Sequence, residues 1–418
     1  MAKIWWKGCV VLLALNTPLV AQSFQIDPQI LYDSQNGPRA SAMGGAYTAI
    51  ANDATALSWN PAGLPEIKET RSFISSSLVF GDLEITPPQQ SANNKTYRAS
   101  RAESFSLDYI GFIIPLPLEK TNVVSSVAVR NLADLNDEYT ISTVDNGTNS
   151  SVDSTFKSRG GLFTLSAGLG VEVIKDLSLG TSLNFISGKK DFRRQASTNV
   201  SNNKIENWTS WENKYSGFSI DFGVFWRASN ILCLGSKMTF PHKINFTDVS
   251  YTDSDNNKRE LNADIYLKRP ISFSYGLALQ PARNLILAFD FNQRPWRKVI
   301  LNMGDHENDR VYENAHSFHI GAEYTLVGKN YLLPWRIGFY TEPEQIFDYA
   351  AAEDDEKGEQ VSSHFITGGL GLNTRKAQFG LSVNYQVLQY RSDFGVPLSP
   401  FDVKHSKFRI NFGLEIII

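Results

Sequence analysis

The last fourteen residues of the chain, HSKFRINFGLEIII (residues 405–418), alternate apolar and polar side chains through most of their length. In a β-strand, successive side chains point to opposite faces, so every second residue shares a face. One face here carries Phe408, Ile410, Phe412, Leu414, Ile416 and Ile418, and the other carries Arg409, Asn411, Gly413 and Glu415. A strand buried on both faces would not carry Arg, Asn and Glu. The stretch therefore predicts a strand with one apolar face and one polar face, as in a transmembrane barrel.

The same alternation recurs along the chain. It is clear in residues 163–173, 177–185, 218–226, 284–292 and 378–387, whose polar faces are rich in Ser, Gly, Asn, Asp, Gln and Glu. Extended over the whole sequence, the pattern predicts fourteen strands near residues 72–84, 103–114, 121–133, 160–174, 176–191, 214–227, 230–246, 264–279, 283–294, 315–327, 330–342, 362–373, 376–391 and 405–418. We therefore expect an all-β fold.

The predicted connections alternate between short and long. The short ones are residues 115–120, 175–176, 228–230, 280–283, 327–330 and 373–376. The long polar ones are residues 85–102, 134–159, 192–213, 247–263, 295–314, 343–361 and 392–404. Short turns on the periplasmic side and long extracellular loops are typical of outer-membrane barrels. The sequence thus predicts a 14-stranded antiparallel transmembrane β-barrel, with both ends of the barrel on the short-turn side.

A soluble propeller or sandwich is the rival interpretation, because it also contains many strands. A propeller would repeat similar residues every ~40–50 positions, and no such repeat is visible. The predicted strands are also about twice the ~5–6 residues of an average soluble strand. Some aromatic residues near predicted strand ends could lie at lipid headgroups, although a core position is the alternative: Tyr109, Phe112, Trp226, Trp335, Phe339 and Tyr340.

The first residues have the features of an export signal. MAKIWWKGC supplies a short basic start, VVLLAL an apolar centre that is too short to cross a bilayer, and Ala21 a cleavage point. We expect a signal peptide at residues 1–21, a hatch at 22–70 and the barrel at 71–418. The exported chain would then keep one cysteine, Cys233, and form no internal disulfide.

No residue pattern points to catalysis, and a net charge of −3 argues against a nucleic-acid partner. His316 and His319 are three apart on a predicted strand, so they should point to opposite faces and not share a metal. The acidic run 353–356 and the Asp-rich run 253–257 have the composition of exposed loops. We predict a non-enzyme without catalytic residues, bound metal or cofactor.

Residues 41–64, SAMGGAYTAIANDATALSWNPAGL, differ from everything that follows them. Small residues would let short helices approach a barrel wall closely. Pro61 disfavours the helical conformation at Asn60, and Gly63 would allow a tight reversal. Since this segment is too apolar for a tail, we expect it to pack inside the lumen as a small helical hatch.

The composite of Ala40–Ala46 (ASAMGGA), residues 51–54 (ANDA) and residues 60–64 (NPAGL) resembles the FadL/TodX family of outer-membrane transporters for hydrophobic compounds. It is also similar to the related PorV/PorQ-like barrels. The resemblance implies a lumenal hatch whose motif and gating residues are Gly44, Gly45, Asn60, Pro61, Ala62 and Gly63.

Two functions follow from this resemblance. The first is transport of a hydrophobic small molecule, such as a long-chain fatty acid or an aromatic hydrocarbon, through a hatch-gated barrel. The second is a PorV/PorQ-like role as a partner of secretion-system proteins at the surface. Both imply a multi-pass barrel surrounded by the lipid of the bacterial outer membrane. The ligand-binding residues, the ligand itself, a lateral or periplasmic exit and the oligomeric state stay open.

Overall fold

A computed structural model describes residues 28–86, 95–101, 103–116, 118, 121–145, 150–200, 203–261, 263–303, 312–348, 359–392 and 401–418. The predicted signal peptide 1–21 and the first hatch residues, 22–27, lie outside the described residues. The division of the chain at residues 21 and 70 therefore stays a prediction.

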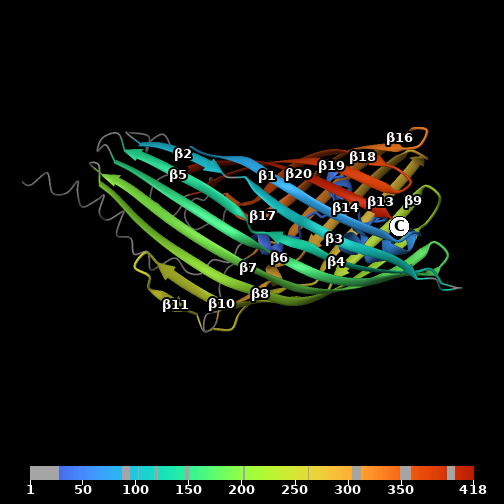
Figure 1. The fold of residues 1–418 in the computed structure, drawn as a ribbon, viewed down its shortest axis with the longest axis horizontal. Coiled ribbons are helices and arrows are strands. Elements are labelled where there is room, and N and C mark those ends of the chain that lie inside the picture. Colours follow the sequence, from blue (N-terminus) through green and yellow to red (C-terminus); the bar gives the residue numbers. More distant parts are fainter. Residues whose placement is uncertain are drawn as a thin grey trace, which may run out of the picture.

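One antiparallel sheet accounts for most of the described chain (Figure 1). Its strands are β1 (Arg71–Thr86), β2 (Lys95–Arg101), β3 (Ser104–Leu116), β4 (Val123–Asp134), β5 (Asp137–Asp145), β6 (Ser150–Ile174), β7 (Leu177–Val200), β8 (Asn203–Arg227), β9 (Leu232–Thr239), β10 (His242–Asp253), β11 (Lys258–Glu260), β12 (Ile265–Arg269), β13 (Ser272–Ala282), β14 (Leu285–Arg294), β15 (Ile300–Met303), β16 (Ala315–Val327), β17 (Leu332–Asp348), β18 (Glu359–Asn373), β19 (Ala377–Ser392) and β20 (Phe401–Ile417).

Some transmembrane strands of the barrel are divided into two or three of these segments. β2 with β3, β4 with β5, β9 with β10, β11 and β12 with β13, and β14 with β15 each continue one another. Counted in this way, the wall has fourteen transmembrane strands, as predicted. β1 pairs with β20 from Arg71↔Ile417 to Thr86↔Asp402, so the sheet closes on itself. Closure pairs the two outer strands and leaves no free sheet edge at the seam.

Three of the breaks coincide with prolines. Pro241 separates β9 from β10, Pro270 separates β12 from β13, and Pro295 separates β14 from β15. Proline has no N–H to donate to a ladder, so it interrupts strand pairing. The first two breaks lie opposite each other, because Thr239 pairs with Ser272 and His242 pairs with Arg269. The strands are therefore interrupted at facing positions on three neighbouring transmembrane strands.

The two rims of the barrel differ, as the connection lengths predict. β6 and β7 are joined by residues 175–176 alone, and β18 and β19 by residues 374–376. β1 begins and β20 ends at this short-turn rim, where the N–H of Ile418 donates to the carbonyl of Thr70 at 2.9 Å.

At the rim with the long connections, one prediction was wrong. Residues 134–159 and 192–213 are mostly strand and not loop, because β6, β7 and β8 continue far past the barrel (Figure 1). The ladder of β6 and β7 runs from Ile174↔Leu177 to Ser150↔Val200, with one register shift between Glu172 and Ile174 at the short-turn end. The ladder of β7 and β8 runs from Leu177↔Trp226 to Val200↔Asn203 without a shift. The residues there are polar on both faces, so their composition resembles that of a loop, but they remain paired with the neighbouring strands.

The outer wall is apolar and the inner wall is polar. Phe408, Phe412 and Ile416 are 39%, 43% and 45% exposed, while Asn411 and Glu415 of the same strand are 2% and 3% exposed. Exposed apolar side chains on many other strands extend this surface far beyond what a soluble monomer shows. Of the aromatic residues predicted at the headgroups, four point outward: Phe112, Trp226, Trp335 and Phe339. Tyr109 and Tyr340 point into the lumen instead, so the core alternative holds for them.

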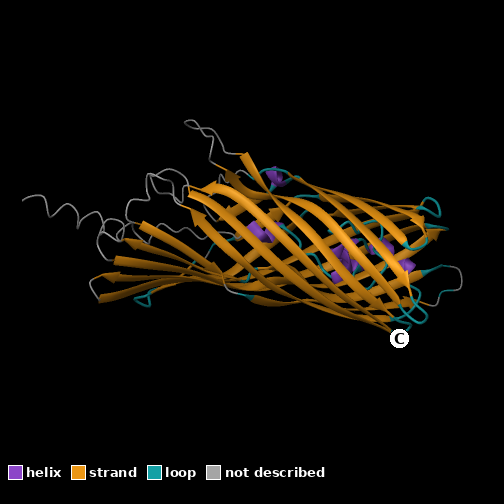
Figure 2. Ribbon diagram, turned by 90° about the horizontal axis from the view of Figure 1, so that it is seen from above, coloured by secondary structure: helices purple, strands orange, loops and turns teal. Residues whose placement is uncertain are grey.

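The N-terminal segment lies inside the barrel (Figure 2). It contains η2 (Pro28–Leu31), α2 (Pro38–Ala42), α3 (Ala56–Trp59) and η3 (Pro61–Glu66), and a further short helix, η5 (Trp296–Lys298), belongs to the wall. The predicted small helical hatch in the lumen is therefore present. Within the described ranges, no helix is long and apolar enough to cross a membrane.

Candidate functional site

Barrel glycines make room for the hatch. Eleven of them, on ten strands, are placed so that an added Cβ would come within 3.0 Å of a hatch atom: Gly168, Gly170, Gly180, Gly223, Gly235, Gly276, Gly321, Gly338, Gly369, Gly380 and Gly413. Many are neighbours across the ladder, as in Gly170↔Gly180, Gly180↔Gly223 and Gly380↔Gly413. We call this set the glycine belt. It lets the hatch backbone lie directly against the wall.

Asn60 sits at the closest of these approaches. A Cβ at Gly223 would lie 2.1 Å from Oδ1 of Asn60. The Asn60 amide donates to the carbonyls of Thr48 at 2.9 Å and Val224 at 3.0 Å, and its Oδ1 accepts from the N–H of Ala62 at 3.1 Å. The side chain is fully buried. Asn60 thus ties two parts of the hatch to each other and to β8.

Pro61, Ala62 and Gly63 form the start of η3 beside it. Asn60 is extended, with φ −159° and ψ 106°, as the following proline predicts. Gly63 was expected to allow a tight reversal, but its φ is not positive. Gly63 instead lets two parts of the hatch backbone pack closely, since a Cβ there would lie 1.9 Å from the carbonyl oxygen of Ala51. Pro61 and Ala62 lie against Gly180 of β7.

Gly44 and Gly45 turn the chain after α2. Their φ angles are +65° and +73°, which is the left-handed region that glycine adopts without strain. Gly44 also lies against the backbone of β17, where its Cβ would be 2.8 Å from the N of Phe339. Its carbonyl is 2.7 Å from Nδ1 of His319 on β16. The six predicted hatch residues therefore all make contacts within the hatch or between hatch and wall. Gly44, Asn60, Pro61 and Ala62 lie directly against the glycine belt, whereas Gly45 and Gly63 make their close contacts elsewhere.

A buried carboxylate holds the turn that follows. Oδ2 of Asp290 on β14 accepts the backbone N–H groups of Tyr47 at 3.0 Å and Thr48 at 2.8 Å. The Tyr47 hydroxyl donates to Asp53 at 2.6 Å, and the Asp53 carboxylate also accepts hydrogen bonds from the N–H and the hydroxyl of Thr55. These contacts fix the loop between α2 and α3.

Two buried carboxylates of the wall hold the hatch at other places. Glu323 on β16 accepts from Arg39 of the hatch at 2.8 Å and from Arg336 of β17 at 2.6 Å. Glu415 on β20 accepts from Arg71 at 2.7 Å and from the N–H of Ala54 at 3.1 Å. Both carboxylates are nearly buried, and both have a cationic partner, as buried charges require.

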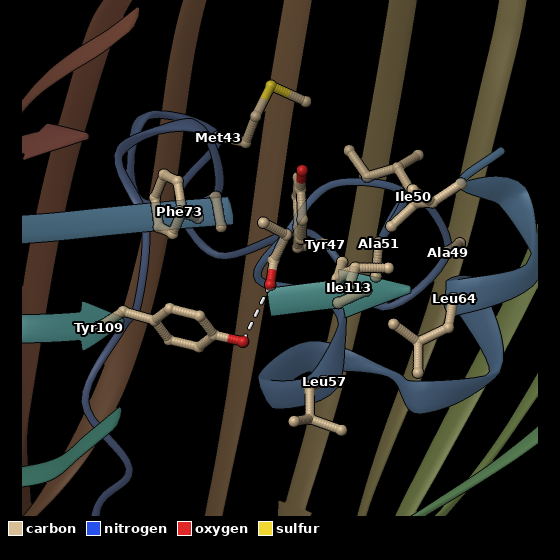
Figure 3. Close-up of a cluster of buried hydrophobic side chains, with 14 of the residues drawn as sticks. Met43, Tyr47, Ala49, Ile50, Ala51, Leu57, Leu64, Phe73, Tyr109 and Ile113 are labelled. Carbon is tan, nitrogen blue, oxygen red and sulfur yellow. Dashed lines mark hydrogen bonds between the residues drawn. The ribbon is translucent and has the colours of Figure 1, made fainter. Parts of the chain in front are cut away.

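Apolar side chains fill the space between these polar contacts (Figure 3). Tyr47, Leu57 and Leu64 of the hatch are fully buried together with Tyr109 and Ile113 of β3. The Tyr109 hydroxyl donates to the carbonyl of Ala54 at 2.9 Å, the bond dashed in Figure 3. Hatch and wall therefore share one hydrophobic core.

The earlier part of the hatch makes a second, separate contact. The rings of Tyr32 and Trp296 pack edge to face, with their centroids 4.5 Å apart. The Tyr32 hydroxyl donates to the carbonyl of Pro343 at 2.8 Å. Asp33 pairs with Arg269 of β12 at 2.9 Å. Burial works against the charged carboxylate of Asp33, but Arg269 and Lys237 outweigh it and hold the pKa of that carboxyl well below its usual range.

The wall is interrupted next to this contact. β3 pairs with β4 only from Tyr109↔Arg130 to Leu116↔Val123, and β2 pairs with β5 from Arg101↔Tyr139 to Lys95↔Asp145. Among the described residues between these two ladders, no ladder pair joins residues 104–108 to residues 131–134. The carbonyl of Leu132 instead accepts the N–H of Ser34 in the hatch at 2.7 Å. We call this interruption the wall window.

A cavity of about 400 Å³ opens on the inner side of the wall window. Hatch residues 29 and 32–35 line it, as do residues 133, 134, 136 and 137 near the window. β17 and β18 contribute Tyr340 and Phe365, and β19 and β20 contribute further residues. Along the strands, the cavity lies between the glycine belt and the rim with the long connections. Its volume is in the range of small-molecule sites.

Sequence reasoning left the ligand-binding residues unassigned, and the structure now supplies candidates. The cavity residues come from distant strands and carry no motif, so their grouping follows only from the closed register of the barrel. His316 and His319 point to opposite faces, as predicted, since His319 is 4% exposed and faces the hatch while His316 is on the outer face. In the part of the chain that the structure describes, no group of three or more His, Cys, Asp or Glu side chains could hold a metal ion.

Comparison with known proteins decides the family. A family model described as BamG matches residues 33–333, which include most of the hatch and more than half of the barrel. The chain belongs to the BamG family. No curated protein sequence matches this BamG-family chain.

Solved structures share the fold. The Pseudomonas putida toluene transporter TodX is 14% identical and has a TM-score of 0.59, covering 92% of this chain and 99% of its own. A Pseudomonas aeruginosa FadL homologue is 12% identical with a TM-score of 0.61, covering 92% and 98%. The Ralstonia pickettii toluene transporter TbuX is 14% identical with a TM-score of 0.58, covering 92% and 98%. The predicted likeness to FadL and TodX is confirmed for the fold, while the likeness to PorV and PorQ stays a prediction.

The fold and the family place this BamG-family protein in the bacterial outer membrane. Its apolar outer surface faces the lipid, and its polar inner surface faces the lumen and the hatch. Short turns usually face the periplasm in outer-membrane barrels, which predicts that side for the short-turn rim and the cell exterior for the long strands β6, β7 and β8.

Proposed function

We propose that this protein takes up small hydrophobic or amphipathic molecules across the outer membrane. The observation that carries the proposal is the cavity of about 400 Å³, which lies between the hatch and the wall window. Solved proteins of the same fold are described as toluene transporters, which supports this class of function.

The exit route in this proposal is lateral. The hatch blocks the path to the periplasm with a shared core, buried ion pairs and the glycine belt. The wall window has no ladder pairs to break, so a ligand that leaves through it disrupts less structure than one that displaces the hatch. Phe105 and Leu107 beside the window are 64% and 41% exposed on the outer wall, where they would meet lipid.

The hatch residues Gly44, Gly45, Asn60, Pro61, Ala62 and Gly63 keep the periplasmic path closed in this proposal. Their contacts fix the hatch to β8, β16 and β17. Movement of the hatch around Asn60 and Pro61 would be the other route, and it would require all of these contacts to be broken.

A disulfide across the wall window tests the lateral route. Nδ2 of Asn131 donates to the Ser106 hydroxyl at 2.8 Å, so the two side chains meet across the window. The double variant S106C/N131C is made to join them by a disulfide, whose formation is checked by the loss of free thiols. It is made together with C233A, to remove the other cysteine of the exported chain. Uptake of radiolabelled toluene and of a long-chain fatty acid is then measured in whole cells, before and after reduction.

We expect uptake to fall on oxidation and to return on reduction. The matched control is F112C/V127C, a pair that joins β3 and β4 where the ladder is already intact. Its oxidation should leave uptake unchanged. Equal uptake by the oxidised and reduced forms of S106C/N131C would rule out the lateral route.

One observation favours the second candidate, a partner role in secretion. β6, β7 and β8 carry a paired sheet beyond the barrel with exposed residues such as Ile205, 54% exposed, and this sheet offers a protein a surface. If cross-linking in cells captured secretion components on this sheet, and toluene and fatty-acid uptake did not depend on the protein, this role would replace transport.

A further inference from the structure

Two lysines lie directly opposite each other on the outer face of the wall. Lys243 of β10 pairs in register with Lys268 of β12, and both residues are exposed. Their neighbours His242 and Arg269, which also form a register pair, are 7% and 6% exposed and face the lumen. Like charges at directly opposite positions of an antiparallel ladder repel each other and destabilise the pairing of the two strands.

A third exposed cation lies beside this pair. It is Lys298, which comes just before Ile300, the register partner of Lys268. We call Lys243, Lys268 and Lys298 the lysine cluster. The ammonium group of Lys243 lies 3.9 Å from the centre of the Tyr266 ring. Within the described ranges, none of the three lysines forms an ion pair with a carboxylate.

Other exposed cations toward the same rim do have carboxylate partners. Three such pairs are Lys189 with Asp191 at 3.2 Å, Lys214 with Asp248 at 2.8 Å and Arg391 with Asp402 at 3.0 Å. The lysine cluster therefore differs from its surroundings, because it concentrates positive charge that no anion of the described chain neutralises. Such a group of ammonium donors suits an anion that comes from outside the chain.

The lysine cluster lies where one crossing of the membrane ends. β13 (Ser272–Ala282) starts beside the cluster and ends at the short-turn rim, and its 11 residues match the ~9–11 that a tilted strand needs to cross a bilayer. Lys268 lies just beyond this crossing. Phe240 and Ile300, close to the lysines, are 40% and 42% exposed. The ammonium groups are therefore at the level of lipid headgroups, with apolar side chains beside them.

We propose that the lysine cluster binds the phosphate group of a membrane lipid. The cluster lies toward the rim for which the cell exterior is predicted, so the lipid is a phosphorylated glycolipid of the outer leaflet, of the lipid A type. Its phosphate oxygens accept hydrogen bonds from the ammonium groups of Lys243 and Lys268, and the negative charge offsets their mutual repulsion. The acyl chains pack on the exposed apolar surface. This inference is independent of the proposed transport.

Two matched lipids test the inference on the purified full chain in detergent. One is diphosphoryl lipid A, and the other is the same lipid after enzymatic removal of both phosphates. Binding is measured by native mass spectrometry over a range of lipid concentrations. We expect the phosphorylated lipid to bind at least about tenfold more tightly, because only this lipid offers acceptors to the ammonium groups.

A double substitution locates the binding. K243Q/K268Q removes two positive charges and should weaken binding of diphosphoryl lipid A by about tenfold, while binding of the dephosphorylated lipid stays unchanged. The matched control is K329Q/K376Q, which removes the same charge from two exposed lysines at the short-turn rim. Its binding should equal that of the native protein. If K243Q/K268Q does not migrate as a folded barrel, K243Q and K268Q are tested singly, and each should weaken binding by a smaller factor.

A competition separates the lipid from a free ion. Inorganic phosphate offers the same oxygens without acyl chains, so a tenfold excess over diphosphoryl lipid A should not displace the lipid. Displacement by this excess would assign the cluster to a free anion and overturn the inference. Equal binding of the two lipids would also overturn it, as would native binding in folded K243Q/K268Q or an equal loss of binding in K329Q/K376Q.

Discussion

The carboxylate of Asp290 accepts a hydrogen bond of 2.8 Å from the backbone N–H of Thr48, although 242 residues separate the two in the chain. It accepts the N–H of Tyr47 as well, at 3.0 Å. No helix or strand pairs these two hatch donors, so the barrel wall supplies their acceptor. A side chain of the wall thus holds this part of the hatch loop in place.

The variant D290A should release this loop. It leaves two buried N–H groups without an acceptor, at a cost of about 1–3 kcal/mol each. The measurement is hydrogen exchange at Tyr47 and Thr48, followed by mass spectrometry, and we expect faster exchange there than in the native protein. D290N keeps an acceptor oxygen and should exchange at an intermediate rate. Native exchange rates in D290A would mean that the loop holds itself.

Gly223 should not tolerate a side chain. A Cβ there would lie 2.1 Å from Oδ1 of Asn60, so G223A must push the hatch away from β8. We expect a loss of about 1–3 kcal/mol in the free energy of unfolding, as for overpacked cores. Urea unfolding of the refolded barrel measures it.

Gly368 provides the matched control. It is also a strand glycine, but a Cβ there would meet no atom closer than 3.6 Å. G368A should therefore unfold at nearly the native urea concentration. If G223A and G368A were equally stable, close approach to the hatch would not explain the glycine belt.

Asn60 is the residue whose loss should loosen the hatch most. N60L removes two donated hydrogen bonds and one accepted bond from buried backbone groups. In planar bilayers we expect N60L to show open-channel events that the native protein lacks, with heat-modifiable gel migration still reporting a folded barrel. K68L is the control, because Lys68 is an exposed hatch residue whose hydrogen bond to the carbonyl of Pro65 stays within the hatch. A silent N60L channel would argue against hatch movement around this residue.

The Asp33–Arg269 ion pair predicts that residues 28–36 of the hatch stay folded in mild acid. Because the pKa of Asp33 is held below its unfolded value, its stabilising effect is complete above that ordinary value, near 4, and is lost only as the pH falls further. Protease cleavage within residues 28–36 should therefore be equally slow at about pH 7 and about pH 5. D33N should be cleaved faster at both pH values, and cleavage that rises between them in the native protein would contradict the assignment.

Much of this fold could be predicted from side-chain alternation, because each strand divides a lipid face from a lumenal face. Phe408 and Asn411 are typical, and they point as the pattern requires. The alternation failed beyond the membrane, where Lys157 and Arg193 pair across β6 and β7 although both faces are solvated. There the ladder hydrogen bonds continue without an apolar face, and polar composition alone resembles a loop.

The hatch motif could be predicted, but its partners could not. Asn60 is marked by the proline that follows it, whereas Gly223 and Asp290 are ordinary members of alternating strands. Their positions opposite the hatch depend on the register of the closed barrel. The cavity residues Glu344 and Asn384 were missed for the same reason, since they lie on different strands and no local spacing links them.

The buried trio of Arg39, Glu323 and Arg336 predicts that a double substitution lowers the free energy of unfolding less than a single one. E323Q leaves two guanidinium groups near each other without an anion, and breaking such a buried pair costs about 3–5 kcal/mol. In E323M/R336M the remaining cation is Arg39, which is partly exposed and keeps its 2.6 Å hydrogen bond to Asn52. The double variant should therefore unfold at a higher urea concentration than E323Q. If the double variant were the less stable of the two, charge compensation would not be what fixes α2 to the wall.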